Sequence, residues 1–445
     1  MAGSTPLDAA LPAAGPQRRP VSVNYVVGLL FLVYLLNYLD RQIVNILAEP
    51  IKQELGLADW QLGLMTGLAF ALFYTVLGIP LARYADRPGA DRSRLITVCL
   101  AVWSAMTALC GLATGFLQLL AARIGVGVGE AGCSPAAHSL ISDLVPKAQR
   151  ATAMGVYSLG IPLGKLVGMA VGGVVAQAVG WRMAFLAVGL PGLALAVLTW
   201  FTLPRPQPVS ATPPAQARFV PVLRELAKVR TFWWVSLGGA FMSFVSYGQT
   251  AFLGSFFIRV HGLTVGEAGV ALGLSMGLAG AVGTWFGGRM ADRAARTDQR
   301  AYVLIPAAAA GLGGVVFAAA VLAQSPAAAL AILAFAGVLN AIWYGPVFAT
   351  VQGLVPPEQR ATAAAVHLFV INLVGLGLGP LAFGGLSDLL NSGWTFGGLG
   401  FAGLGPRQGL RVALLMGSGL AFLALAAFWR AGRTIRGELE DQHAS

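Results

Sequence analysis

Stretches of about 20 predominantly apolar residues recur along the whole chain, and no other feature constrains the fold as strongly. As a helix, each stretch is long enough to cross a hydrocarbon core about 30 Å thick. Only 11% of the 445 residues are charged, too few for the surface of a water-soluble protein of this size. We therefore predict an all-α membrane protein with twelve transmembrane helices, at residues 22–48, 58–83, 93–113, 116–144, 149–178, 182–203, 231–258, 265–289, 301–323, 326–353, 360–388 and 409–430.

The basic residues predict how these helices are oriented. With twelve spans, twenty-one of the 29 Lys and Arg residues fall on the side of the N-terminus and five on the other side. Cytoplasmic loops carry such an excess, so both termini are expected to be cytoplasmic. The net charge of +11 is spread over short loops and forms no single patch, which argues against nucleic-acid binding. The cysteines, Cys99, Cys110 and Cys133, lie in apolar runs and imply neither disulfides nor a metal cluster.

Two loop sequences occur twice. Leu144–Ala153 recurs 210 residues later as Leu354–Ala363. Ala85–Arg87 recurs 206 residues later as Ala291–Arg293. A repeat at nearly one offset predicts two parallel six-helix bundles. We divide the chain into a cytoplasmic tail without a cleavable signal peptide (1–21), a first bundle (22–203), a linker (204–229), a second bundle (230–430) and a cytoplasmic tail (431–445).

The linker contains a segment in which apolar and basic residues alternate. Within Arg218–Arg230, the apolar residues Phe219, Leu223, Leu226 and Ala227 are interspersed with basic ones. This pattern is typical of a helix that lies on a membrane surface, and we expect it on the cytoplasmic side.

The loop Ala82–Gly89 looks like the signature Gly-x-Leu-Ala-Asp-Arg-x-Gly of the major facilitator superfamily, and Gly288–Arg293 is a partial second copy. Three further segments, Asn37–Arg41, Arg123–Ala131 and Gly377–Pro380, resemble hallmark sequences of the Spinster branch of that family. The resemblance implies the major facilitator fold. It also implies proton-dependent export, with lysolipids or sphingoid phosphates as the substrates of better-known relatives.

Charged residues inside spans are the best functional pointer, because an ionised side chain at mid-bilayer costs at least ~3 kcal/mol. Arg123 and Glu130 are seven residues apart, which places them on one face of a helix and roughly 10 Å apart along its axis. Asp40 lies at a depth similar to that of Arg123. We predict an Asp40–Arg123 ion pair with Glu130 deeper on the same wall. Asp40 and Glu130 would exchange protons while Arg123 sets their affinity; the alternative is a static ion pair that joins two helices.

Other polar residues in the spans are candidates for substrate binding. Arg41 either extends toward the membrane surface or faces the cavity and meets an anionic head group. Lys165 either binds an anion, pairs with Glu130 or has a packing role. A histidine such as His367 more often has a structural role than a role in binding. The second half supplies neutral groups that would suit an apolar tail. The complete predicted set is Arg41, Arg123, Lys165, Tyr247, Gln249, Asn340, Tyr344 and His367.

These features predict a proton-coupled secondary transporter of the cell (inner) membrane. We expect an antiporter that exports an amphipathic anionic or zwitterionic, lipid-like substrate. The alternatives are a symporter that imports a small organic anion with protons and a broad-specificity drug exporter. We expect no enzymatic activity, no cofactor and no metal; the partners are the substrate, protons and membrane lipids, and the protein acts as a monomer. Gating contacts are expected at Asp86, Arg87, Asp292 and Arg293.

Overall fold

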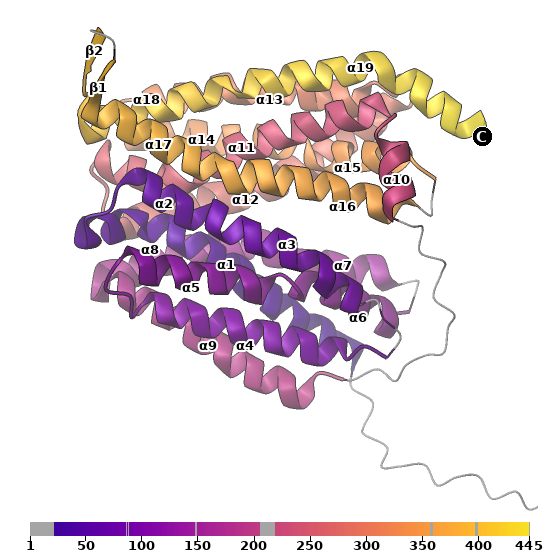
Figure 1. Ribbon diagram of the computed structural model, residues 1–445, viewed down its shortest axis with the longest axis horizontal. Coiled ribbons are helices and arrows are strands. Elements are labelled where there is room, and N and C mark those ends of the chain that lie inside the picture. The colour runs from indigo at the N-terminus through magenta and orange to yellow at the C-terminus, as the bar shows by residue number, and fades with distance from the viewer. Residues whose placement is uncertain are drawn as a thin grey trace, which may run out of the picture.

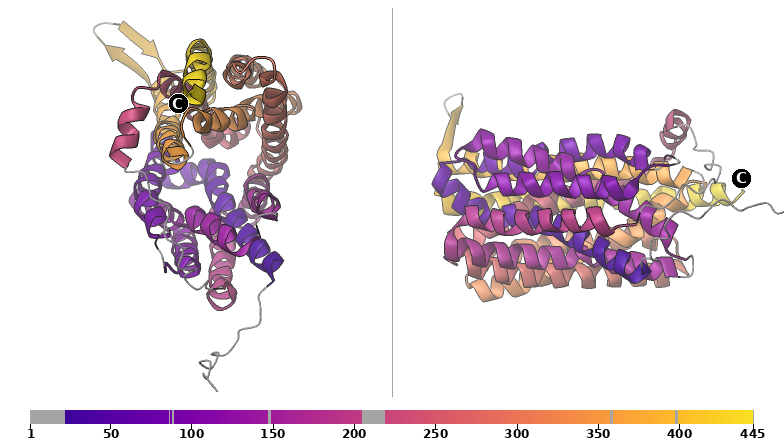
Figure 2. Two further views of the ribbon diagram at one scale, coloured as in Figure 1. Left: turned by 90° about the vertical axis from the view of Figure 1, so that its right-hand side faces the viewer. Right: turned by 90° about the horizontal axis from the view of Figure 1, so that it is seen from below.

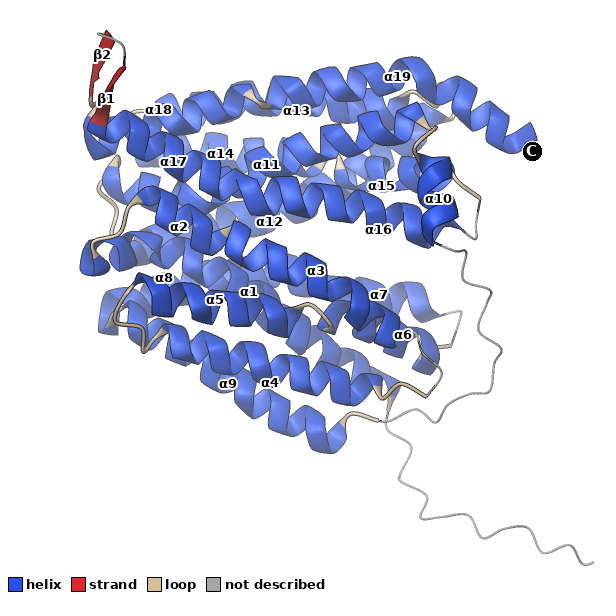
Figure 3. Cartoon of the chain, viewed as in Figure 1, coloured by secondary structure: helices blue, strands red, loops and turns tan. Residues whose placement is uncertain are grey.

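The structure, a computed structural model, describes residues 22–85, 87, 89–146, 149–204, 219–356, 359–396 and 399–444. Long helices run side by side in two groups, and one short hairpin of strands projects from the bundle (Figures 1 and 3). We call the end that carries the hairpin the hairpin end. The opposite end, where the last helix finishes, is the termini end (Figure 1).

The described residues of the N-terminal half form nine α-helices. In three of its six predicted spans the structure has two consecutive helices; α2 and α3, for example, are separated at Gly67. The helices are α1 (Val23–Leu55), α2 (Asp59–Thr66), α3 (Leu68–Ala85), α4 (Arg92–Cys110), α5 (Phe116–Glu130), α6 (Cys133–Leu144), α7 (Arg150–Ser158), α8 (Gly160–Val179) and α9 (Trp181–Thr202).

The C-terminal half follows the short helix α10 (Phe219–Leu226). Its long helices include a π-helical segment, η3, and the two strands form an antiparallel pair in which Gly393 lies opposite Ala402. The elements are α11 (Arg230–Arg259), α12 (Val265–Ala295), α13 (Ala301–Leu322), α14 (Pro326–Ala341), α15 (Tyr344–Gly353), α16 (Arg360–Ile371), η3 (Asn372–Leu378), α17 (Gly379–Ser392), β1 (Gly393–Phe396), β2 (Leu399–Ala402), α18 (Gly405–Gly419) and α19 (Ala421–Ala444).

Eleven helical segments of the described chain are long and apolar enough to cross a membrane. The helix α11 has 30 residues but is not among them, because polar residues such as Ser243, Tyr247 and Gln249 lower its hydropathy. The prediction of a helical membrane protein is therefore confirmed, with eleven such helices among the described residues. The hairpin was not predicted; it lies between the last two predicted spans.

The linker helix α10 forms where a surface helix was predicted, but its apolar side has a different partner. Val222 and Leu226 are 2% and 1% exposed and belong to the apolar core of the C-terminal half. The indole Nε1 of Trp233 also donates a hydrogen bond to the carbonyl oxygen of Leu226, at 3.0 Å. Leu226, which we expected to face lipid, therefore packs on protein, because the C-terminal half offers an apolar surface beside it.

The buried apolar residues show where the two halves meet. The largest cluster takes residues from both halves, among them Ile46, Phe252 and Leu272. Two further clusters are each built mostly from one half. Figure 2 shows the two groups of helices along and across their axes. The halves therefore share one core toward the hairpin end and have largely separate cores toward the termini end.

Glycines allow the helices that border this shared core to approach closely. A Cβ atom at Gly168 of α8 would lie 2.7 Å from the carbonyl oxygen of Leu39 in α1. A Cβ atom at Gly273 of α12 would lie 2.7 Å from the carbonyl oxygen of Leu166 in α8. The first contact lies within the N-terminal half and the second joins the two halves.

Candidate functional site

The first buried ion pair joins α1 to α5. Nη1 of Arg123 donates to Oδ1 of Asp40 at 3.1 Å, and both side chains are only 2% exposed. Oδ2 of Asp40 accepts a hydrogen bond from the hydroxyl group of Thr107 in α4. The expected pair between Asp40 and Arg123 is therefore present, and Thr107 satisfies the second carboxylate oxygen.

The second buried ion pair joins the same two helices but has a different composition from the one we expected. Nε of Arg41 lies 2.6 Å from Oε2 of Glu130, whose side chain is fully buried. Glu130 thus pairs with Arg41, whereas we had assigned Arg123 to both carboxylates. The side chains of a helix lean toward its N-terminus, so the long Arg41 side chain can reach back along α1 toward Glu130.

Aromatic rings surround the Arg41 guanidinium. Its Cζ lies 4.5 Å from the ring centre of Tyr74, 5.0 Å from that of Phe70 and 5.2 Å from that of Tyr38. Such rings stabilise a cation most strongly where water is scarce. Arg41 therefore faces the protein interior. Its partner there is Glu130, which neither alternative from the sequence had named.

The two pairs are arranged crosswise. Helix α1 supplies an acid and a base at adjacent positions, Asp40 and Arg41, and α5 supplies a base and an acid seven residues apart, Arg123 and Glu130. Each pair is neutral as a whole, which lowers the free energy of holding four charges in a poorly hydrated place.

Lys165 lies on α8, the helix that contacts both α1 and α12. It is half-buried, and it forms neither an ion pair nor a hydrogen bond with any other described residue. Of the alternatives considered for Lys165, the pair with Glu130 is absent, and Glu130 pairs with Arg41 instead. Lys165 is therefore a basic residue of the bundle with which no described acidic side chain pairs.

The neutral residues predicted for the second half have varied surroundings. His367 is fully buried, and its Nδ1 shares a hydrogen bond of 3.0 Å with Ser236. The rings of Trp343 and Tyr344 are stacked with their centres 4.2 Å apart. Gln249 is 3% exposed, and Asn340 is half-buried.

Tyr247, one of these neutral candidates, packs against the core cluster of the N-terminal half. It extends from α11 toward the half that carries the charged pairs. His367 is bound to its own half through Ser236, in keeping with the structural role that its residue type favours.

The three predicted gating residues that the structure describes, Arg87, Asp292 and Arg293, lie at or near the termini end. Asp86 is outside the described residues, and Arg87 and Arg293 are exposed. Asp292 accepts a hydrogen bond of 3.1 Å from the hydroxyl group of Tyr302, which joins α12 to α13 within one half.

Comparison with known proteins identifies the family. The model of the Major Facilitator Superfamily matches residues 30–380. This chain belongs to the Major Facilitator Superfamily. It is 35% identical over 432 residues to an MFS-type efflux pump of Mycolicibacterium smegmatis, covering 96% of each chain. It is 27% identical to a hexuronate transporter of Bacillus subtilis, covering 93% of this chain and 95% of the relative.

A solved structure of the superfamily shares the fold closely. It is a bacterial homologue of the human lysosomal transporter Spinster, described as inward-facing and unoccupied. The TM-score is 0.83 at 32% identity, with 94% of this chain and 98% of the other covered. The resemblance to the Spinster branch that the sequence motifs indicated is thereby confirmed.

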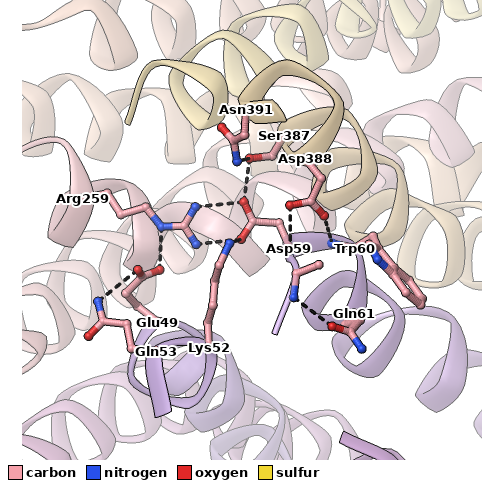
Figure 4. Close-up of polar contacts among 11 residues, drawn as sticks. Glu49, Lys52, Gln53, Asp59, Trp60, Gln61, Arg259, Ser387, Asp388 and Asn391 are labelled. Carbon is pink, nitrogen blue, oxygen red and sulfur yellow. Dashed lines mark hydrogen bonds and ion pairs between the residues drawn. The ribbon is translucent and has the colours of Figure 1, made fainter. Parts of the chain in front are cut away.

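A second polar cluster, which the sequence did not reveal, lies at the hairpin end (Figure 4). Arg259 of α11 forms two hydrogen bonds to Asp59 of α2, at 2.7 and 2.9 Å, and one to Glu49 of α1, at 2.7 Å. Lys52 and Ser387 also bind the Asp59 carboxylate, at 2.5 and 2.7 Å. These contacts connect the two halves of this superfamily member.

Helix α2 is capped by the other half as well. The carboxylate of Asp388 in α17 accepts hydrogen bonds from the backbone N–H groups of Asp59 and Trp60, at 3.0 and 2.7 Å. The first N–H groups of a helix lack partners within the helix, so an acidic group stabilises them. The cap, like the ion pairs, is lost if the halves separate at this end.

Proposed function

We propose that the chain is a proton-coupled antiporter that exports an amphipathic, lipid-like substrate by alternating access. The observation that supports it best is the Arg41–Glu130 ion pair, buried beside the Asp40–Arg123 pair. Burying charge in a membrane costs free energy, so four ionised groups in one place indicate a role in transport. The similarity to an efflux pump and to an inward-facing Spinster homologue is consistent with export.

Paired buried charges suit proton coupling because each partner controls the other. A carboxylate that loses its guanidinium partner in a poorly hydrated site binds a proton more readily. A guanidinium whose carboxylate partner becomes protonated is free to bind another anion. Protonation of Glu130 and occupancy of Arg41 are therefore linked.

Whether the coupling is antiport or symport depends on whether the substrate contacts Glu130 or Arg41. An ammonium group at Glu130 competes with the proton for one carboxylate, so that substrate and proton bind alternately, as antiport requires. An anionic group at Arg41 leaves Glu130 unpaired, so that anion and proton bind together, as symport requires. Antiport export therefore favours the zwitterionic member of the substrate classes expected from the sequence.

The test is the Glu130→Gln variant in proteoliposomes that contain a pH-sensitive dye. A zwitterionic lysolipid should drive proton movement in the parent protein and not in Glu130→Gln, because the amide cannot bind the proton. The matched control is Glu54→Gln, since Glu54 is an exposed carboxylate of the same helix that bonds Arg182. Undiminished proton flux in Glu130→Gln would contradict the proposal.

A second candidate is proton-coupled import of a small organic anion, and Lys165 is the observation that favours it. With both buried pairs neutral, Lys165 leaves an excess of positive charge that an anion would balance. The similarity to a hexuronate transporter points the same way. Lys165→Gln should raise the KM for a sugar acid roughly tenfold, while Lys165→Arg should retain binding.

Counterflow with labelled substrates separates the two candidates. Accumulation of a labelled lysolipid, with protons moving against it, supports the antiporter. Accumulation of a labelled sugar acid together with protons supports the symporter. A drug exporter would instead accept unrelated cationic and neutral compounds at similar rates.

We also propose twelve membrane helices, with α11 as the seventh, and both termini in the cytoplasm of the cell. The excess of basic residues in the loops of the termini end supports this orientation. The hairpin end then faces outward, and the protein acts as a monomer. An impermeant maleimide applied to intact cells should label Arg407→Cys and leave Arg293→Cys unlabelled; both positions are exposed in the structure.

A further inference from the structure

The Asp59 carboxylate is held across the halves by a set of donors that resembles a binding site for a free carboxylate. Arg259 contributes two parallel hydrogen bonds, from Nη1 to Oδ2 at 2.9 Å and from Nη2 to Oδ1 at 2.7 Å. The hydroxyl group of Ser387 adds a bond of 2.7 Å to Oδ2. Both donor residues belong to the C-terminal half (Figure 4).

This donor geometry is specific. Two parallel N–H groups of one guanidinium match the two oxygens of a carboxylate, which makes such pairs stronger and better oriented than single contacts. While the hairpin end is closed the site is also dry, since the Arg259 side chain is 6% exposed and that of Asp59 is fully buried. In that state a carboxylate held by Arg259, as Asp59 is, gains more than one bound at a wet surface.

The carboxylates in this cluster are divided between the halves. Glu49 and Asp59, which neutralise Arg259, are in the N-terminal half, as is Lys52. In the C-terminal half, Asp388 is directed at the backbone of α2 and bonds the N–H groups of Asp59 and Trp60 (Figure 4). Separation of the halves at the hairpin end would therefore remove both carboxylates from Arg259 and leave Ser387 beside it.

We propose that Arg259 and Ser387 form an anion-binding site for a small carboxylate at the hairpin end. Asp59 occupies that site while this end is closed. When the halves separate, a carboxylate from solution takes the place of Asp59 and holds this end open. The site lies apart from the Arg41–Glu130 pair, and it depends neither on proton coupling nor on the identity of the transported substrate.

The experiment uses acetate as the probe and the accessibility of one cysteine as the readout. Ile46 of α1 is 1% exposed and lies against Gly254 of α11, so that Ile46→Cys reports separation of the halves. The background is the purified full chain with its three native cysteines replaced by alanine. The rate of labelling by a charged maleimide is measured at one pH and one ionic strength, with acetate or with chloride.

Acetate should act in opposite directions in two variants. Where Asp59 is present, acetate competes with it for Arg259 and should speed labelling. In Asp59→Ala, labelling should be about tenfold faster than in the parent, since a cross-half pair is lost. Acetate fills the space left by the missing carboxylate of Asp59→Ala and should slow labelling back toward the parent rate.

The Arg259→Gln substitution is the matched control. Added to either background, it should remove the acetate effect while leaving labelling fast, and Ser387→Ala should weaken the effect. An acetate effect of one sign in both backgrounds, no effect in either, or an effect that survives Arg259→Gln would overturn the proposal. If Asp59→Ala fails to give monodisperse protein, the acceleration expected with Asp59 present, and its loss in Arg259→Gln, still decide the matter.

Discussion

The protein contains two networks of buried ion pairs that differ in what they connect. Asp40–Arg123 and Arg41–Glu130 both join α1 to α5, within the N-terminal half. The pairs of Arg259 join α11 to α1 and α2, and so cross from one half to the other. Burial does not distinguish the networks, because the side chains of the Asp40–Arg123 and Arg259–Asp59 pairs are at most 6% exposed.

This contrast shows which contacts can persist when the halves move. A rigid-body movement of one half against the other leaves α1 and α5 together, so the Asp40–Arg123 and Arg41–Glu130 pairs can persist in every state. The same movement breaks the pairs of Arg259 and the Asp388 cap on α2. Under the proposed function, the first network would therefore serve coupling and the second would hold one end closed.

The largest loss of stability is expected from a substitution that breaks an ion pair within one half. Asp40→Ala should destabilise the protein by about 3–5 kcal/mol, because it leaves the Arg123 charge buried and unpaired. The double variant Asp40→Asn/Arg123→Gln removes both charges and should recover much of that loss. Thermal unfolding in detergent provides the measurement.

Arg259→Gln is the matched change across the halves. Arg259→Gln leaves Glu49 and Asp59 without their guanidinium partner. Separation of the halves exposes both carboxylates to water, so the variant should open at the hairpin end more readily than it unfolds. An equal loss of thermal stability in Asp40→Ala and Arg259→Gln, without extra labelling of Ile46→Cys, would remove the distinction between the two networks.

A smaller effect is expected from two glycine substitutions that create the same local clash. Gly168→Ala and Gly273→Ala each place a Cβ atom 2.7 Å from a backbone carbonyl oxygen. Gly168 faces α1 in its own half, so Gly168→Ala should cost about 1–3 kcal/mol of stability.

Gly273 faces α8 in the other half, so separation of the halves relieves the clash in Gly273→Ala. We expect this variant to unfold near the parent temperature and to label Ile46→Cys faster. Faster labelling in Gly168→Ala than in Gly273→Ala would show that the halves do not separate between α8 and α12.

The smallest effect is expected from an ion pair that is neither buried nor between the halves. Arg182 of α9 pairs with Glu54 of α1, and their side chains are 34% and 50% exposed. Arg182→Gln should change stability by less than about 1 kcal/mol and leave labelling of Ile46→Cys unchanged. A change in labelling as large as that of Arg259→Gln would mean that any charge lost at this end opens it.

Most of the helices were predictable because a membrane helix carries its signal locally. A run of apolar residues at the right length is sufficient, and the predicted spans correspond to helices in the structure. The hairpin β1–β2 was missed since its short, glycine-rich strands lack an alternating pattern long enough to recognise. The buried side of α10 was missed because an amphipathic pattern does not say whether lipid or protein covers it.

Part of the charged site was predictable as well. The spacing of Arg123 and Glu130 shows that they share a helix face, and similar depth was enough to pair Asp40 with Arg123. The Arg41–Glu130 pair required the reach and direction of a long side chain, which spacing does not specify. The Arg259 cluster combines residues from α1, α2, α11 and α17 that the sequence places in separate loops and helix ends.

The amino-acid sequence alone established apolar helices, an internal repeat, the family's motifs and a set of charges at membrane depth. These properties follow from composition and spacing along a single helix. Which acid meets which base, and whether a pair lies within a half or between halves, became known from how the helices are folded together. The physical reason is that an ion pair depends on a few ångströms between side chains of different helices, a distance set by how the glycine-lined helices pack.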